Sequence, residues 1–74
     1  MKLVTYIHNK TSQLGIIHEG KIWNLKDLDA SFPDKMRKFL FAGEQVMEKA
    51  KKWDAQIKLG KVDKPFTLEA DVVL

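Results

Sequence analysis

Two histidines are the residues of this chain best suited to metal binding or proton transfer, because imidazole titrates near neutral pH and is a common metal ligand. His8 and His18 lie at the ends of two expected strands that a tight turn joins. At ~3.4 Å per residue the two side chains are about 17 Å apart along this strand pair. A zinc–nitrogen bond is only ~2.1 Å long, so one ion cannot bind both. We interpret them as strand-end residues without a catalytic role.

The carboxylates provide two further candidates. Glu69 and Asp71 are two residues apart on an expected strand, so both face one side and could hold Mg²⁺. The solvated face of an edge strand is the interpretation that we favour. Asp27 and Asp29 lie between the expected sheet and the first helix, where Asp commonly bonds the local backbone. The sequence therefore predicts no catalytic, cofactor-binding or metal-binding residue in this chain.

Other signatures of chemistry or of the membrane are missing. The chain has no cysteine, so it offers no thiolate to zinc and no disulfide. It has no glycine-rich phosphate loop and no GxSxG turn. No apolar run resembles a signal peptide or approaches the ~18 residues of a membrane span, so we expect no membrane partner. The lack of cysteine fits a reducing compartment, and the predicted localisation is cytoplasmic.

Charge gives a weak indication of nucleic-acid binding. The chain has 13 basic and 10 acidic residues, a net charge of +3 and a pI near 9.3. The two signs are interspersed along the sequence, which is typical of a solvated surface.

With 74 residues, 45% of them hydrophobic, the chain is long enough for one small folded domain over residues 1–74.

The two tryptophans could serve as stacking platforms for bases. Trp53 shares an apolar stripe at helical spacing, so we expect it in the core. That stripe consists of Val46, Ala50, Trp53 and Ile57. Trp23 follows Ile22 on a strand, where neighbours face opposite sides, so one of the two is expected to face outward. An outward tryptophan could stack a base or pack on a partner domain.

The first third of the chain predicts three strands. Residues 2–8, 13–18 and 21–25 are rich in β-branched and aromatic types, which suit a pleated sheet. Turn residues at 9–12 and the pair Glu19-Gly20 separate them, the second as a two-residue hairpin. The three strands are expected to form an antiparallel meander.

Two helices should follow. Pro33 fits the first turn of a helix that ends near Gly43. Its apolar stripe would be Met36, Phe39 and Leu40. A longer helix should run from Glu44 and end at Gly60, with the stripe named above facing the sheet.

The tail, residues 66–74, alternates apolar and polar residues and predicts a strand or an extended segment lying on a neighbour. The expected fold class is thus α+β, a three-stranded meander followed by two helices and a C-terminal extended strand. Burying such apolar side chains contributes roughly 1.5–3 kcal/mol each. We therefore expect the isolated chain to self-associate. The predicted partner-contact residues are Trp23, Phe66, Leu68, Val72 and Leu74.

The order of these segments resembles the N-terminal domain of the fumarylacetoacetate hydrolase family, in its bacterial two-domain, 2-hydroxyhepta-2,4-diene-1,7-dioate isomerase-like type. The opening LVTYIHNKTSQLGIIHEGKIWNL is similar to the family's first strands. Ile22-Trp23-Asn24-Leu25 stands for a "V-x-D-L" element, with Asn24 where the family often has Asp. Phe32-Pro33-Asp34-Lys35-Met36 and Ala42-Gly43-Glu44 match its Leu-Pro and "aGe" elements. Residues 68–74 look like its approach to the catalytic domain.

The resemblance covers the whole chain through soft apolar patterns rather than catalytic signatures. It implies a non-catalytic N-terminal domain, whose partner is the catalytic domain of the same protein. Full-length relatives hydrolyse, isomerise or decarboxylate oxo-acids with Mg²⁺ or Mn²⁺. The ligands of that metal, a Glu-x-Glu pair and a later Asp, lie in the larger C-terminal domain, which this sequence lacks. Glu69-Ala70-Asp71 is not that motif because it precedes the catalytic domain.

A second interpretation stays open beside this one. The chain could be a stand-alone basic interaction module that binds nucleic acid. The residues for that role would be Lys10, Lys21, Trp23 and Lys26. An independent small enzyme is disfavoured, because no catalytic constellation is present.

Overall fold

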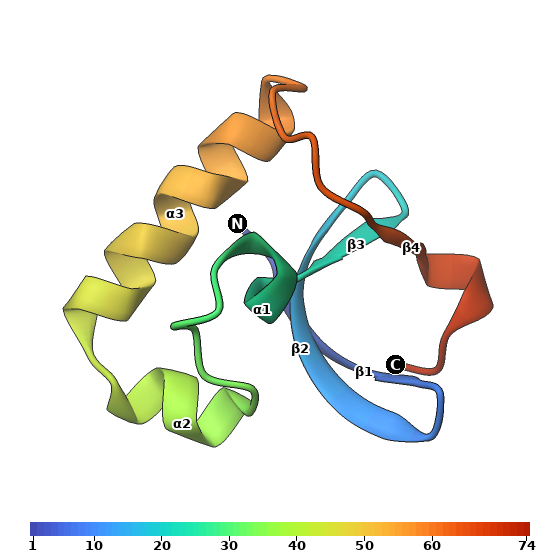
Figure 1. Ribbon diagram of the computed structural model, residues 1–74, viewed down its shortest axis with the longest axis horizontal. Coiled ribbons are helices and arrows are strands. Elements are labelled where there is room, and N and C mark those ends of the chain that lie inside the picture. The colour runs from blue at the N-terminus through green and yellow to red at the C-terminus, as the bar shows by residue number, and fades with distance from the viewer.

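The computed structural model describes residues 1–74 and places an antiparallel sheet between helices on one side and the C-terminal tail on the other (Figure 1). The strands are β1 (Leu3–His8), β2 (Thr11–His18), β3 (Lys21–Asn24) and β4 (Thr67–Leu68), hydrogen-bonded in that order. All their pairings are antiparallel. The predicted α+β class and the three-stranded meander are confirmed.

Both hairpins of the meander turn through two residues. Glu19 and Gly20 have φ angles of 50° and 77°, the positive values that a type I′ turn requires and that match the twist of the strands. Asn9 and Lys10, in the turn between β1 and β2, also have positive φ angles, of 52° and 62°. This first turn is shorter than the expected 9–12, so β2 begins at Thr11, which pairs directly with His8.

Each face of the sheet carries its own apolar core. Leu14, Ile16 and Trp23 belong to the larger cluster on the helix side. Tyr6, Ile17 and Ile22 form a smaller cluster, against which Val72 of the tail packs. The expectation that Ile22 or Trp23 faces solvent is wrong, because the two are 0% and 7% exposed in different cores. Neighbouring strand residues can both be buried only where both faces are covered.

Two short helices follow the sheet. α1 (Leu25–Leu28) is capped by Asn24, whose side chain accepts a hydrogen bond from the Lys26 amide at 2.9 Å. α2 (Met36–Phe41) begins three residues after Pro33, so the prediction that Pro33 occupies a first helical turn is wrong. The segment before α2 first places Phe32 in the core. Its ring lies 6.5 Å from that of Phe39, and helical winding starts after this anchor.

The long helix α3 (Glu44–Lys58) begins at the predicted residue and ends two residues before Gly60. At its end the Gly60 amide bonds the Ile57 carbonyl and the Lys61 amide bonds the Gln56 carbonyl, each at 3.0 Å. This is a Schellman ending, with Gly60 at φ 71°. The predicted stripe faces the sheet, although Trp53 and Val46 are only partly buried.

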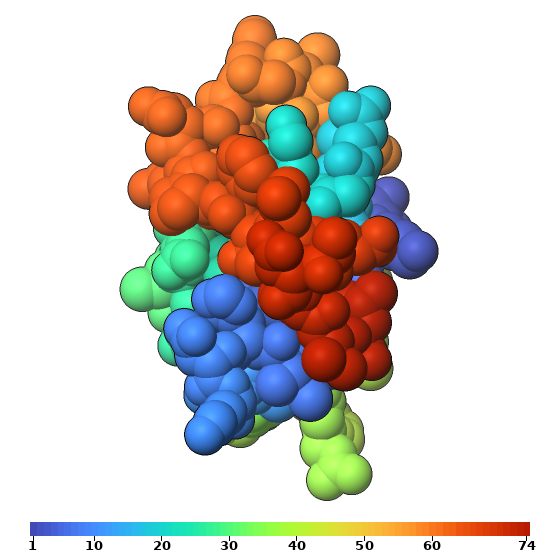
Figure 2. Space-filling view, turned by 90° about the vertical axis from the view of Figure 1, so that its right-hand side faces the viewer, coloured from blue at the N-terminus to red at the C-terminus, as the bar shows by residue number.

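The C-terminal tail crosses the face of the sheet that lies away from the helices (Figure 2, red). It runs from the β3 edge to the β1 edge. β4 pairs with β3, η1 (Glu69–Asp71) makes a 3₁₀ turn, and the Ile7 amide then bonds the Val73 carbonyl at 2.8 Å. Of the strand or extended segment predicted for residues 66–74, a strand forms at Thr67–Leu68, and the 3₁₀ turn then interrupts the extended chain. A straight strand pairs with one edge only, whereas this tail covers both β3 and β1.

Gly15 lies at the middle of β2, where the backbones and side chains come closest. A Cβ atom there would stand 2.7 Å from the Trp23 carbonyl oxygen and 2.8 Å from Ile22 Cγ2. The Tyr6 ring would be 3.1 Å away. Glycine is needed at this position for close approach rather than for an unusual φ.

We predict that Gly15→Ala lowers the free energy of unfolding by about 1–3 kcal/mol, because overpacking forces neighbouring atoms apart. Urea denaturation followed by circular dichroism measures the change. The matched control is Ser12→Ala, an exposed position on the same strand, which should stay within about 0.5 kcal/mol of the parent. Equal stability of the Gly15→Ala variant would contradict the close approach.

Candidate functional site

The structure keeps the two histidines apart. His8 pairs with Thr11 at one end of β2, and His18 pairs with Lys21 at the other end. No group of three or more His, Cys, Asp or Glu side chains is placed to hold a metal ion. Glu69 and Asp71 lie in η1 rather than on a strand, so the expectation that strand geometry puts both on one side is wrong.

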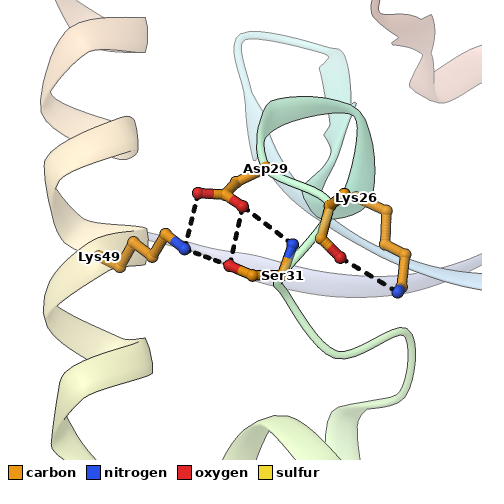
Figure 3. Close-up of polar contacts among 5 residues, drawn as sticks. Lys26, Asp29, Ser31 and Lys49 are labelled. Carbon is orange, nitrogen blue, oxygen red and sulfur yellow. Dashed lines mark hydrogen bonds and ion pairs between the residues drawn. The ribbon is translucent and has the colours of Figure 1, made fainter.

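The densest polar cluster joins α3 to the loop after α1 (Figure 3). Lys49 Nζ lies 2.6 Å from Asp29 Oδ2, and it also contacts Ser31 Oγ. The Ser31 amide and hydroxyl both donate to Asp29 Oδ1, at 2.9 and 2.8 Å. The Lys49 ammonium group stands 5.1 Å from the Phe32 ring centre. One lysine of α3 therefore fixes both the loop and its aromatic anchor.

A Ser–Lys–Asp cluster invites a nucleophilic interpretation, but the electrostatics favour a structural one. The hydrogen bond from Lys49, with those from Ser31, holds the pKa of Asp29 well below its usual range. Lys49, the group that contacts the Ser31 hydroxyl, is itself ion-paired with Asp29, so neither side chain is free to act as a base toward Ser31. None of the surface pockets is lined by Ser31. We interpret the cluster as a clamp.

Two titratable groups are buried, and both have structural partners. Burial raises the pKa of Tyr6, whose hydroxyl donates to Gln13 Oε1 at 3.3 Å. Asp54 is 6% exposed and was not predicted to be inside. Its carboxylate lies 3.0 Å from Lys58 Nζ and 3.6 Å from the amino group of Met1. Neither group faces another base or nucleophile in a catalytic arrangement.

The most exposed apolar surface belongs to α2, which we call the α2 surface, formed by Met36, Arg37, Leu40 and Phe41. Leu40 is 64% exposed and Phe41 85% exposed. The prediction that Leu40 shares the buried stripe is wrong. Successive helical residues are turned by about 100°, so Phe39, Leu40 and Phe41 cannot all face one core. Phe39 is the one that does, at 1% exposure.

The predicted partner-contact residues divide into two groups. Phe66, Leu68 and Leu74 are 47%, 48% and 64% exposed and remain free to meet a partner. Trp23, also predicted as a partner contact, is in the core at 7% exposure, and Val72 is partly covered by the chain itself. The tail residues are thus split because the tail folds back on its own sheet.

A pocket of about 380 Å³ lies between the β2–β3 hairpin, the C-terminal end of α3 and the loop that follows. Trp23, Ile57, Val62 and Phe66 provide its apolar lining. Its polar lining residues are His18, Glu19, Lys21, Lys58, Gly60, Asp63 and Lys64. Two segments far apart in the sequence, residues 18–23 and 57–66, build it, so sequence patterns could not reveal it.

Positive charge is concentrated on one part of the chain. Residues 49–64 contain six lysines and two aspartates, a net charge of +4. The other residues have seven basic and eight acidic side chains, a net charge of −1. The signs are therefore less evenly mixed than expected, and the basic segment covers most of α3 and one wall of the pocket.

Comparisons of the chain with protein-family models, with curated proteins and with solved structures found no match. None of the helices combines the length and the apolar character needed to cross a membrane.

The clamp predicts a pH-dependent contribution to stability. Because the pKa of Asp29 is lower in the folded chain than its ordinary 3.8, the ion pair stabilises the fold above about pH 4, and this contribution fades as pH falls further. Asp29→Asn should therefore be less stable than the parent at pH 7, with the difference shrinking toward pH 2. Urea titrations at several pH values measure it. A difference independent of pH would contradict the clamp.

Two phenylalanines of α2 provide a test of the exposed surface. Phe39→Ala should cost about 3–5 kcal/mol, because it removes a buried ring. Phe41→Ala should change the free energy of unfolding by less than about 0.5 kcal/mol. Thermal and urea unfolding compare the two variants. Similar losses in both would show that α2 faces the core differently.

Proposed function

We propose that this chain is the non-catalytic N-terminal domain of a fumarylacetoacetate-hydrolase-family protein, and that it packs on the catalytic domain of that protein. The observation that carries the proposal is the α2 surface. Leu40 and Phe41, adjacent on a helix of only six residues, expose most of their apolar area. A helix this short has little stability of its own, so an apolar partner would both cover these residues and order the helix.

The sequence resemblance supports the same partner. It follows the chain from the first strand to the tail, and the α+β fold is compatible with it. Phe66, Leu68 and Leu74 add exposed apolar area on the tail, the segment that in the resembled proteins approaches the catalytic domain. In this proposal Mg²⁺ or Mn²⁺ belongs to the catalytic domain, which acts on oxo-acids in the cytoplasm. This chain supplies no ligand to the metal.

In isolation the same surfaces are proposed to pair two copies of the chain. A second function, a basic module that binds nucleic acid, is favoured only by the charge of residues 49–64. Trp23 cannot stack bases there because it is buried, which weakens that alternative. A salt titration separates them, since phosphate contacts weaken steeply and linearly on a log–log plot.

The experiment that tests the proposal has two arms. The reading frame downstream of Leu74 should continue into a domain with a Glu-x-Glu motif, and a frame without it would contradict the family assignment. Sedimentation velocity of the isolated chain at high micromolar concentration should show a dimer. The double variant Leu40→Ser, Phe41→Ser should shift it to monomer, whereas the exposed, polar-face control Lys51→Ser should not. A strictly monomeric parent would contradict the apolar docking surface.

A further inference from the structure

The pocket between the β2–β3 hairpin and the end of α3 has an aromatic lining that is open to a ligand. The rings of Trp23 and Phe66 have centroids 5.5 Å apart and are tilted by 47°. Trp23 is buried, whereas Phe66 is 47% exposed, so Phe66 presents ring surface to solvent. Ile57 and Val62 complete the apolar lining. A pocket of about 380 Å³ is within the ordinary range for small-molecule sites.

Two lysines that line the pocket, Lys21 and Lys64, are free to bind a negatively charged group. Lys21 Nζ stands 5.0 Å from the centre of the Phe66 ring, and neither Lys21 nor Lys64 forms an ion pair. Lys58 is paired with Asp54, the buried acid of α3. Two acids also line the pocket. Glu19 is 3.8 Å from His18, and Asp63 has no cationic partner.

With Lys58 paired to Asp54, the lining has two other lysines against two acids, so any excess of positive charge at the pocket comes from the adjoining residues 49–64, of net charge +4. A cationic ligand would meet this excess of positive charge unfavourably, whereas a monoanion would reduce it. Lysine ammonium groups also form charge-assisted hydrogen bonds with carboxylates, which are stronger than neutral ones.

We propose that this pocket binds a small planar carboxylate. The planar part lies against Phe66 and the neighbouring apolar lining, and the carboxylate is held by Lys21 and Lys64. The proposal goes beyond the docking function and does not depend on it, because none of the residues of the α2 surface line this pocket.

Benzoate is a suitable probe, with benzamide as its neutral isostere and benzylammonium as its cationic counterpart. Each is titrated into ¹⁵N-labelled chain at low salt, and amide chemical shifts are followed. Benzoate should give saturable shifts confined to residues 18–23 and 57–66. It should bind about tenfold more tightly than benzamide, because only the carboxylate gains charge-assisted bonds. Benzylammonium should bind most weakly.

Variants assign the carboxylate contacts. Lys21→Gln and Lys64→Gln should each weaken benzoate binding by about threefold or more, and both positions are exposed, so the fold is retained. Lys51→Gln is the matched control, because it removes the same charge from the basic segment at a residue that lines no pocket. It should leave the affinity unchanged.

Three outcomes would overturn the proposal. Benzamide binding as tightly as benzoate would remove the role of the carboxylate. An equal loss with Lys51→Gln would show that binding follows net charge rather than the pocket. Shifts that never saturate, or that spread over the whole surface, would show that no site exists. Each readout uses the isolated chain and its own amides, so it is independent of any catalytic domain.

Discussion

The close approach of β2 to β3 at Gly15 is the constraint on which the rest of this small structure depends. A sheet with apolar residues on both faces must be shielded from solvent on both faces. In a chain of 74 residues, few remain outside the strands to provide that shielding. The helices provide one cover and the tail the other (Figure 1). The tail can act as a cover because it pairs with β3 through Thr67 and Leu68 and with β1 through Val73. The tight packing beneath it brings Tyr6 and Ile22 against a position where only glycine fits.

Local features of the fold were predictable from the sequence. The turn at Glu19-Gly20, the α3 ending at Gly60 and the inward stripe of that helix depend on neighbouring residues and on helical geometry. The features that failed depend on distant contacts. Alternation along the strand predicts that either Ile22 or Trp23 faces solvent, and both are buried because the tail covers the second face of the sheet. Pro33 was expected inside a helix because the burial of Phe32 was unknown.

The candidate sites also divide into those that neighbouring residues determine and those that depend on contacts between distant segments. Exposure of Phe66, Leu68 and Leu74 was anticipated, since an alternating tail with no visible partner leaves apolar groups outside. The α2 surface was missed, although three consecutive apolar residues, Phe39 to Phe41, were a signal that one helix face could not bury them all. The pocket had no sequence signal, because its lysines and rings come together only when the loop after α3 returns to the β2–β3 hairpin.

The long helix sets the distance between the two proposed sites, the α2 surface and the pocket. α2 immediately precedes the N-terminal end of α3, and the pocket lies at its C-terminal end. Fifteen residues of α-helix rise about 22 Å at 1.5 Å per residue. A partner seated on Leu40 and Phe41 therefore need not approach Lys21 or Lys64. The Asp29–Lys49 clamp fixes α3 to the sheet side between these two ends, so the separation is part of the fold rather than of a flexible linker. Docking at one end of the helix and ligand binding at the other are compatible in a single copy of this chain.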